Sequence, residues 1–410
     1  MKLIRNIIHY LTAVTALCSF SILGLTAYID IAAPEHYYNI EGESFSVSSM
    51  FGLELGTTYQ ADTAAQTTES TPVTQEVELS LFGIIPVKTA TVETIQNVEL
   101  VPCGTPFGVK ILTDGVIVVG LNEIATETGS RNPAKEAGVQ TGDIIIKINN
   151  TPVSSNDDVA KIISASGGKS VTIEYKRGER TGVLTLTPAL SAIDRTYKAG
   201  LWVRDSSAGI GTVSFYDPET QAFGGLGHAI CDVDTGEVLP VMQGDVVNVK
   251  IHDIVKGTVG TPGELRGSFV SKDSCGTILI NNESGVFGKM YDPPSYQEAV
   301  PLGLKQEVKS GKATILTTLN GSIPKEYEIE IVKINLLENS PTKNMVIKIT
   351  DPELLELCGG IVQGMSGSPI LQNGKLIGAV THVFVNDPTQ GYAIFAENMY
   401  QNIASMRSQT

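Results

Sequence analysis

The stretch Gly364-Met-Ser-Gly-Ser-Pro369 lies just before an apolar run, Lys375 to His382, that reads as a buried strand. Glycines on both sides of a serine let the backbone turn sharply and direct its N–H groups at one point, where the oxygen of a tetrahedral intermediate can sit. Ser366 is then the candidate nucleophile, and the amides of Gly364 and Ser366 are the candidate oxyanion donors. Because turns rich in glycine and serine are common between strands, this loop alone is a weak signal.

The region after Pro188 supports a β fold around this loop. Its sequence consists of short segments rich in valine and isoleucine, separated by glycine, with almost no helical periodicity. Such spacing is typical of a barrel or a sandwich. With the serine loop near its end, the region suits the two-barrel fold of trypsin-like peptidases, so we expect a peptidase domain over residues 191–410. The clearest predicted strands are 249–255, 277–281, 313–319, 326–332, 344–349 and 375–382, and only 396–406 looks helical.

A serine nucleophile of this kind needs a histidine base, and the region offers His228, His252 and His382. The trypsin-like chain order is histidine, aspartate, serine, so His382, which follows Ser366, is the poorest base and is assigned instead to the substrate pocket. His252 lies in the middle of a predicted strand. His228 lies between glycine and apolar neighbours that can hold an imidazole in a tight, dry turn, so it is the favoured base.

The carboxylate that would orient the histidine has two candidates. A standard double barrel places it some way after the histidine, which nominates Asp273. Asp351 stands at the end of a predicted strand shortly before Ser366, and Pro352 restricts its backbone. The residues by themselves do not separate the two.

Residues 104–190 form a recognisable module. The stretch from Asn132 to Val153 closely resembles the signature of a bacterial PDZ domain, and a helix with Asn156 as N-cap is predicted over 157–166. The resemblance implies that Phe107, Gly108 and Val109 hold the C-terminal carboxylate of a peptide on their amides while the peptide adds as a strand beside the helix. The competing interpretation is a PDZ fold that serves only as a spacer or docks on its own peptidase domain.

The N-terminus predicts export. Lys2 and Arg5 precede an apolar run that is long enough to span a bilayer, so residues 1–30 are interpreted as a signal anchor rather than a cleaved signal peptide, with the following residues outside the cytoplasm. Residues 31–80 are rich in Ser, Thr, Gln and Glu and are expected to form an exposed stalk, followed by a β linker over 81–103. The stalk between Gly56 and Glu78 is the predicted site of self-cleavage in trans.

Composition excludes several functions. The 29 basic and 44 acidic residues give a net charge of −15, which argues against binding nucleic acid or an anionic membrane surface broadly. The five cysteines are far apart and include no C-x-x-C pair, so neither a zinc knot nor a redox motif is supported. We expect no metal and no cofactor.

The order of anchor, stalk, PDZ module and β peptidase resembles the stage IV sporulation protein B peptidases. The resemblance rests on Gly200 to Thr212, on Leu226-Gly-His-Ala-Ile230 and on Gly359 to Ile370. It implies a catalytic triad of His228, Asp351 and Ser366, and so selects Asp351 over Asp273.

The same resemblance implies a serine endopeptidase of sporulation signalling in the space between the two membranes of the endospore. Its expected substrates are itself and the regulatory subunit of an intramembrane protease, whose release leads to sigma-factor maturation. Two rivals are an envelope quality-control protease of the HtrA type, which usually carries its PDZ domain after the peptidase, and a catalytically silent PDZ scaffold, which would give the Ser366 loop and His228 no purpose.

Overall fold

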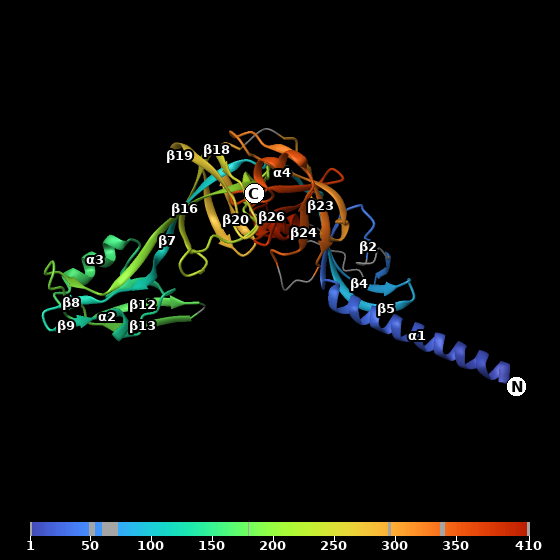
Figure 1. Ribbon diagram of the computed structural model, residues 1–410, viewed down its shortest axis with the longest axis horizontal. Helices are drawn as coiled ribbons and strands as arrows, with labels where there is room; N and C mark the ends of the chain where they lie inside the picture. The colour runs from blue at the N-terminus through green and yellow to red at the C-terminus, as the bar shows by residue number, and fades with distance from the viewer. Residues whose placement is uncertain are drawn as a thin grey trace.

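The computed structural model describes residues 2–48, 54–59, 73–178, 180–293, 297–336 and 341–407. Figure 1 shows three parts along the long axis: a mixed α/β unit at one end, a pair of barrels in the middle, and an N-terminal sheet from which a long helix projects at the other end. Strands dominate in every part except that helix. The mainly β fold class with two barrels is therefore confirmed.

The first barrel closes through six antiparallel strands. Its ring closes because β7 pairs with both β16 and β18. Aromatic and aliphatic side chains fill the interior, and the rings of Phe107 and Phe223 meet edge to face at 5.9 Å. In ring order the strands are β7 (Pro106–Leu121), β16 (Leu201–Tyr216), β17 (Ala222–Gly225), β20 (Gly285–Met290), β19 (Glu264–Asn282) and β18 (Val241–Val255), and the short strands β6 (Glu99–Pro102) and β21 (Val300–Pro301) extend the sheet beyond β16.

The second barrel repeats this topology. It is a closed ring in the order β22-β23-β24-β27-β26-β25, so that in both barrels the first strand pairs with the second and the fourth, and the third pairs with the sixth. Its strands are β22 (Gly311–Thr317), β23 (Lys325–Ile334), β24 (Met345–Ile349), β25 (Pro369–Gln372), β26 (Lys375–Phe384) and β27 (Asp387–Phe395), with the short helices η1 (Lys305–Glu307) before β22 and α4 (Pro352–Cys358) before β25. The last helix, α5 (Ala396–Arg407), packs on β17 and β20 of the first barrel and on β26 of the second, and so joins the two.

Strands β7 and β16 also form part of the α/β unit. Residues 107–112 of β7 pair within the barrel, whereas residues 117–121 pair with 201–204 of β16 and residues 116–117 with β10 of the α/β unit. The unit is therefore inserted between the first two strands of the first barrel. The boundaries predicted at 104 and 190 do not match this arrangement, because each connecting strand is continuous through both units.

The α/β unit has the helices and strands that the PDZ signature predicts. Helix α3 begins one residue after Ser155, which is the N-cap in place of the predicted Asn156 and forms a capping box with Asp158. Its elements are β8 (Ile124–Thr126), β9 (Gly129–Arg131), α2 (Pro133–Ala137), β10 (Ile144–Ile148), β11 (Thr151–Pro152), α3 (Asn156–Ala165), β12 (Val171–Arg177), β13 (Arg180–Leu186), β14 (Ala189–Leu190) and β15 (Tyr197–Lys198).

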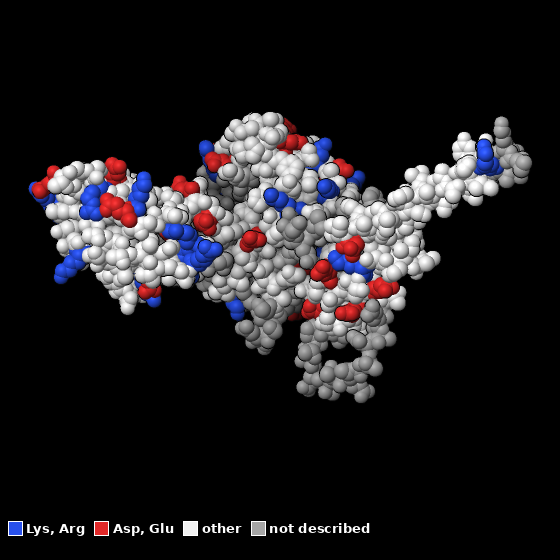
Figure 2. All heavy atoms as spheres, turned by 90° about the horizontal axis from the view of Figure 1, so that it is seen from below, with Lys and Arg blue, Asp and Glu red and all other residues white. Residues whose placement is uncertain are grey.

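The N-terminal helix α1 (Lys2–Ala32) projects away from the molecule. Figure 2 shows its surface as almost free of charge, apart from basic atoms near its outer end. Residues Arg5 to Ala32 are long and apolar enough to cross a membrane by length and composition, and only the inner end of the helix, near Leu25 and Ile29, packs on the N-terminal sheet. Such a helix fits either a membrane anchor or a signal sequence.

The region expected to be an exposed stalk instead contains a folded sheet. Strands β1 (His36–Ile40), β5 (Ile85–Ile95), β4 (Val73–Leu81), β3 (Glu54–Tyr59) and β2 (Val47–Ser48) lie side by side in that order. The stalk prediction is thus wrong for the described residues, because apolar residues at every second position of β4, Val77, Leu79 and Leu81, bury one face of the sheet among polar neighbours. Residues 49–53 and 60–72, which include most of the predicted cleavage window, lie outside the described residues.

Candidate active site

The Ser366 loop connects α4 to β25 and is built on two left-handed glycines. Gly364 and Gly367 have φ values of +97° and +95°, which other residues rarely adopt. Gly367 also has no room for a side chain, because an added Cβ would lie 2.1 Å from the carbonyl oxygen of Thr212 and 2.5 Å from the amide nitrogen of Leu226. The two glycines therefore let the serine loop of the second barrel press directly on the first.

Backbone contacts hold this loop from both barrels. On the first barrel, Thr212 donates its amide to the carbonyl of Ser366 at 3.0 Å and its hydroxyl to the carbonyl of Gly364 at 2.7 Å. On the second barrel, the amide of Gly367 donates to the carbonyl of Val380 at 2.7 Å, and Ser366 Oγ donates to the carbonyl of Thr381 at 2.9 Å. Thr212 and Thr381 were not predicted as site residues, although Thr212 ends the glycine-rich stretch used in the family resemblance.

The two amides predicted to be oxyanion donors have no hydrogen-bond partner in the described structure. Within the described part of the chain, no hydrogen bond engages the amide of Gly364 or that of Ser366, whereas Met365 donates to Val362 and Ser368 donates to Met365. Gly364 and Ser366 are both partly exposed, so a substrate can reach these two amides.

His228 reaches the same place from the first barrel. It follows β17 directly after Leu226 and Gly227, which both have positive φ values, and Gly227 packs on Thr381 and Val380 of β26. Its Nδ1 lies 2.8 Å from the carbonyl oxygen of Ala229, an arrangement in which Nδ1 carries the proton and Nε2 is left as the base. Thus Ser366 and His228, more than a hundred residues apart in sequence, both contact the Val380 to His382 segment of β26.

The second imidazole of the site belongs to His382. The centroids of the His228 and His382 rings are 4.9 Å apart, with a tilt of 37° between the ring planes. The His382 side chain is covered on one side by His228 and keeps part of its surface exposed, which suits the substrate-pocket position predicted for it. Partial burial, with smaller contributions from His228 and from Lys343, lowers the pKa of His382, while burial lowers the pKa of His228 against the opposing effect of the Ala229 carbonyl. Both surroundings therefore favour the neutral form of the imidazole.

Neither predicted carboxylate lies beside His228. Asp351 is the N-cap of α4: its Oδ1 accepts from the amides of Glu353 and Leu354 at 2.9 and 3.1 Å, and its Oδ2 accepts from the amide of Glu328 at 3.3 Å. Tyr392 of β27 pairs with His382 on one side and with Val346 of β24 on the other, so His382 and Val346 lie at the same height in the barrel. Asp351 is five residues beyond Val346 along β24 and its extension, which is about 16 Å at the rise of a strand. Asp273 is exposed in the middle of β19, nine residues from the Asn282 end of that strand.

The remaining predicted residues lie away from this site. His252 is exposed on β18. Phe107, Gly108 and Val109 lie inside the first barrel, where β7 pairs with β16 on one side and with β18 on the other. The prediction that they bind a peptide carboxylate is wrong, because both ladders already use the backbone there and Phe107 is buried in the barrel core.

The α/β unit has a different groove, between α3 and the end of β16 that lies in this unit. Its volume is about 1070 Å³, and it is lined on one side by Val159 and Ile163 of α3 and on the other by Leu201 and Trp202 of β16. Gly200, at its end, has a φ of +72°. In the sequence, the end of this groove is marked by the Gly200-Leu-Trp run, which resembles in composition the Phe107-Gly-Val run predicted to bind the carboxylate.

Comparisons with known proteins agree with this architecture. A model of the SpoIVB peptidase S55 family matches residues 195–400, half of the chain, and a model of the PDZ domain matches residues 129–177. The second match confirms the predicted PDZ domain.

Solved structures and curated relatives resemble this chain more distantly. The PDZ domain of the SdrC-like protein of Listeria monocytogenes is 22% identical, with a TM-score of 0.18, over 22% of this chain and 87% of that chain. The inactive form of the Rv3671c protease of M. tuberculosis is 15% identical, with a TM-score of 0.26, over 48% of this chain and 84% of that chain. Putative zinc metalloproteases of Neisseria meningitidis and Clostridium acetobutylicum are 23% and 29% identical over 42% and 20% of this chain, which spans 37% and 26% of their length.

Proposed function

Because the chain belongs to the SpoIVB peptidase S55 family, we propose that it is a serine endopeptidase in which Ser366 is the nucleophile and His228 the general base. The observation that carries this proposal is the convergence of the two barrels at β26. There Ser366 donates to the carbonyl of Thr381, and His228 lies against the ring of the next residue of the same strand, His382. The contact of His228 Nδ1 with the Ala229 carbonyl leaves Nε2 as the nitrogen that can take a proton. These are the parts that acyl transfer requires.

The chemistry follows from these groups. The Ser366 hydroxyl rotates from the Thr381 carbonyl towards His228, whose Nε2 takes its proton as Oγ attacks the scissile carbonyl carbon. The amides of Gly364 and Ser366 donate to the oxyanion. His228 then gives its proton to the leaving amine as the C–N bond breaks. Water, deprotonated by His228, attacks the acyl-enzyme, and the proton returns to Ser366 Oγ as the acid product leaves.

A serine-reactive fluorophosphonate probe tests this assignment. We expect the full-length protein to be labelled at Ser366, which peptide mapping by mass spectrometry identifies, and the Ser366→Ala protein to stay unlabelled. If the folded wild-type protein is not labelled, the scaffold interpretation replaces the peptidase.

The role of Asp351 in a triad stays a prediction from the family resemblance, and Asp351→Asn tests it cleanly. Asparagine caps a helix about as well as aspartate, so the fold should be kept. With Asp351 placed as in this structure, we expect kcat to fall by less than about tenfold. A loss of about 10⁴-fold, as when other triads lose the orienting carboxylate, would show that Asp351 reaches His228 in the working enzyme. Asp273→Asn is the matched control, for which we expect no change.

The pH profile gives an independent test. Because His228 acts as a base in its neutral form and burial lowers its pKa below the ordinary value of about 6.5, kcat/KM should stay high until the pH falls below that value. The measurement is the acid limb of kcat/KM at pH values where circular dichroism shows a folded protein. An acid limb with its midpoint above pH 7 would contradict the observed surroundings of His228, because it requires a nearby carboxylate that raises the pKa.

We further propose the biological setting that the family resemblance implies. The apolar helix α1 anchors the chain in a membrane, with the peptidase outside the cytoplasm of the cell that makes it, in the space between the membranes of the endospore. The protein substrates include a second copy of the chain and the regulatory subunit of an intramembrane protease, and cleavage leads to sigma-factor maturation. Mixing the Ser366→Ala protein with active enzyme and sequencing the new N-termini tests self-cleavage in trans, and an absence of new N-termini at every concentration would refute it.

A further inference from the structure

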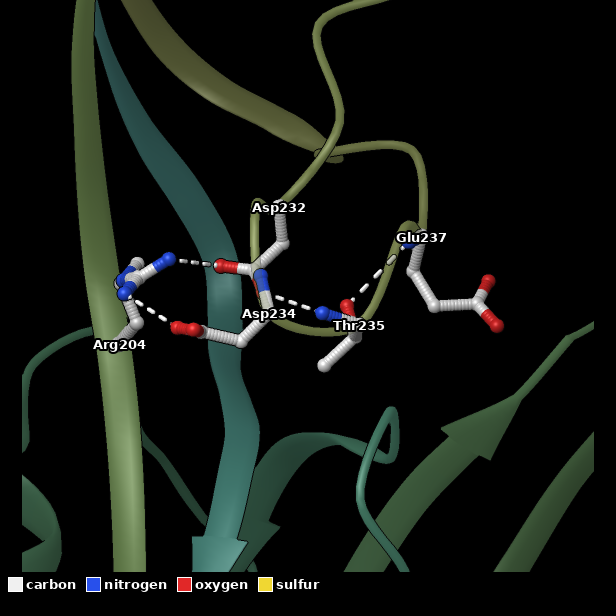
Figure 3. Close-up of polar contacts among 5 residues, drawn as sticks. All are labelled: Arg204, Asp232, Asp234, Thr235 and Glu237. Carbon is white, nitrogen blue, oxygen red and sulfur yellow. Dashed lines mark hydrogen bonds and ion pairs between the residues drawn. The ribbon is translucent and has the colours of Figure 1, made fainter. Parts of the chain in front are cut away.

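A buried carboxylate of the first barrel pairs with an arginine that lies at the junction with the PDZ domain. The Asp232 side chain has no exposed surface, and its Oδ2 lies 2.5 Å from a terminal nitrogen of Arg204 on β16. The other terminal nitrogen of Arg204 lies 2.6 Å from Asp234 Oδ2. Figure 3 shows Arg204 reaching from its strand to both carboxylates, while the carboxylate of Glu237 points away. One guanidinium thus holds two points of the same turn.

The turn is otherwise tightly organised around Asp232. Its Oδ1 accepts from the amides of Asp234 and Thr235, both at 3.0 Å, and Thr235 Oγ1 accepts from the amide of Glu237 at 3.2 Å. Burial by itself would raise the pKa of Asp232, but the turn amides and Arg204 lower it overall, so the carboxylate is ionised. A buried ionised carboxylate depends strongly on its counter-charge.

Asp232 follows His228 by only four residues, and the chain between them has little freedom. The side chain of Asn281 accepts from the amide of Ile230 at 2.8 Å and donates to the carbonyls of Ile230 and Leu239 at 2.9 Å. The backbones of Cys231 and Val238 form an isolated antiparallel β-bridge, and the amide of Asp232 donates to the carbonyl of Glu237. The segment between the turn and His228 is thus held at both ends, and it includes Ala229, whose carbonyl oxygen accepts from His228 Nδ1.

The arginine is placed where the PDZ domain meets the barrel. Arg204 directly follows Leu201 to Val203, which line the PDZ groove, and a β-bulge between Arg204 and Ser206 separates the two parts of β16. The next residue, Asp205, accepts the amide of Asn156 at the start of α3 at 2.9 Å. The two adjacent side chains thus connect β16 to the His228 segment on one side and to the groove helix on the other.

We propose that Arg204 is a positioning residue for the peptidase reaction, which through its ion pairs with Asp232 and Asp234 fixes the segment that carries His228. It touches neither substrate nor reacting atoms, and it acts from the strand that enters the PDZ domain. This inference rests on the proposed serine peptidase function. It makes the base of the barrel site depend on how the PDZ domain is seated, because the same strand serves both.

The test compares Arg204→Met with Arg204→Lys in the full-length protein. Methionine removes the charge and keeps an unbranched side chain, and a small misplacement of a catalytic group costs on the order of 10²-fold. We expect Arg204→Met to lower kcat and the rate of fluorophosphonate labelling of Ser366 by about 10- to 100-fold, with KM changed by less than about twofold. Lysine keeps the positive charge but has a single nitrogen in place of the two terminal guanidinium nitrogens, so we expect Arg204→Lys to recover only part of the wild-type labelling rate.

Arg195→Met is the matched control, because Arg195 forms an exposed ion pair with Glu127 within the PDZ domain and does not contact the barrel turn in the described structure. It should label at the wild-type rate. Asp232→Asn combined with Arg204→Met should lose little more than either alone, since the two act as one unit.

A wild-type labelling rate for a folded Arg204→Met protein would overturn the proposal, as would a loss proportional to the unfolded fraction measured by circular dichroism. If Arg204→Met fails to fold, the Arg204→Lys protein provides the test. A folded Arg204→Lys protein with the wild-type kcat and the wild-type labelling rate would refute a role for the two-pronged guanidinium contact. Failure of the wild-type protein to label would instead refute the peptidase function itself.

Discussion

Ser366→Ala is expected to reduce kcat by about 10⁵- to 10⁶-fold while the protein stays folded, because it removes the nucleophile and leaves only the binding and oxyanion contacts. The structure gives little reason for a loss of stability, since the hydroxyl makes one hydrogen bond, to the Thr381 carbonyl, in a loop that its backbone holds in place. The free energy of unfolding should change by no more than about 1 kcal/mol. The measurement is steady-state turnover of an unstructured protein substrate alongside thermal unfolding.

Ser368→Ala is the control in the same loop. The Ser368 hydroxyl is buried and has no hydrogen-bond partner in the described structure, so its loss should affect neither activity nor stability by much. An inactive Ser368→Ala protein beside an active Ser366→Ala protein would show that the loop presents the other serine.

His228→Ala should cost nearly as much as Ser366→Ala, because a serine hydroxyl is a weak nucleophile without a base to take its proton. The double mutant should lose no more than either single mutant, since the two groups act as a unit. His252→Ala is the control, as that imidazole lies exposed on β18, and it should keep wild-type kcat. Losses that multiply in the double mutant would separate His228 from the serine mechanism.

The location of His382 makes a third histidine variant informative. Its ring lies 4.9 Å from that of His228, yet it comes from β26 beside Thr381. A role in the substrate pocket implies that its replacement changes KM and substrate preference more than kcat. This distinguishes His382 from His228, although the two rings are neighbours.

Local sequence patterns predicted the parts of this protein whose signals are local. Short segments rich in valine and isoleucine predicted strands of both barrels, among them the alternately buried β23 and β24 and the continuously buried β26. The PDZ signature was also recognisable in the sequence. So were the glycines around Ser366, since the left-handed backbone at Gly364 and Gly367 excludes most other residues. The choice of His228 over His382 as the base, made from chain order, stays a prediction.

Average composition led to a wrong prediction where it conflicted with the alternation of apolar residues. Residues 73–81 are polar on average, which predicted a stalk, yet Val77, Leu79 and Leu81 share one face and are buried in the N-terminal sheet. The Phe107-Gly-Val run reads like a PDZ carboxylate loop, and only its pairing with β16 and β18 shows that it is a barrel strand.

The sequence by itself determined the two barrels, the PDZ domain and the apolar N-terminal helix, because periodicity, glycine placement and motif spacing depend on neighbours along the chain. Tertiary structure alone decided that the PDZ domain is inserted between β7 and β16, that Thr212 and Thr381 hold the serine loop, and that Arg204 binds the turn after His228. Each of these depends on contacts between residues far apart in sequence, and such contacts are set by how the barrels close and pack, which no local pattern encodes.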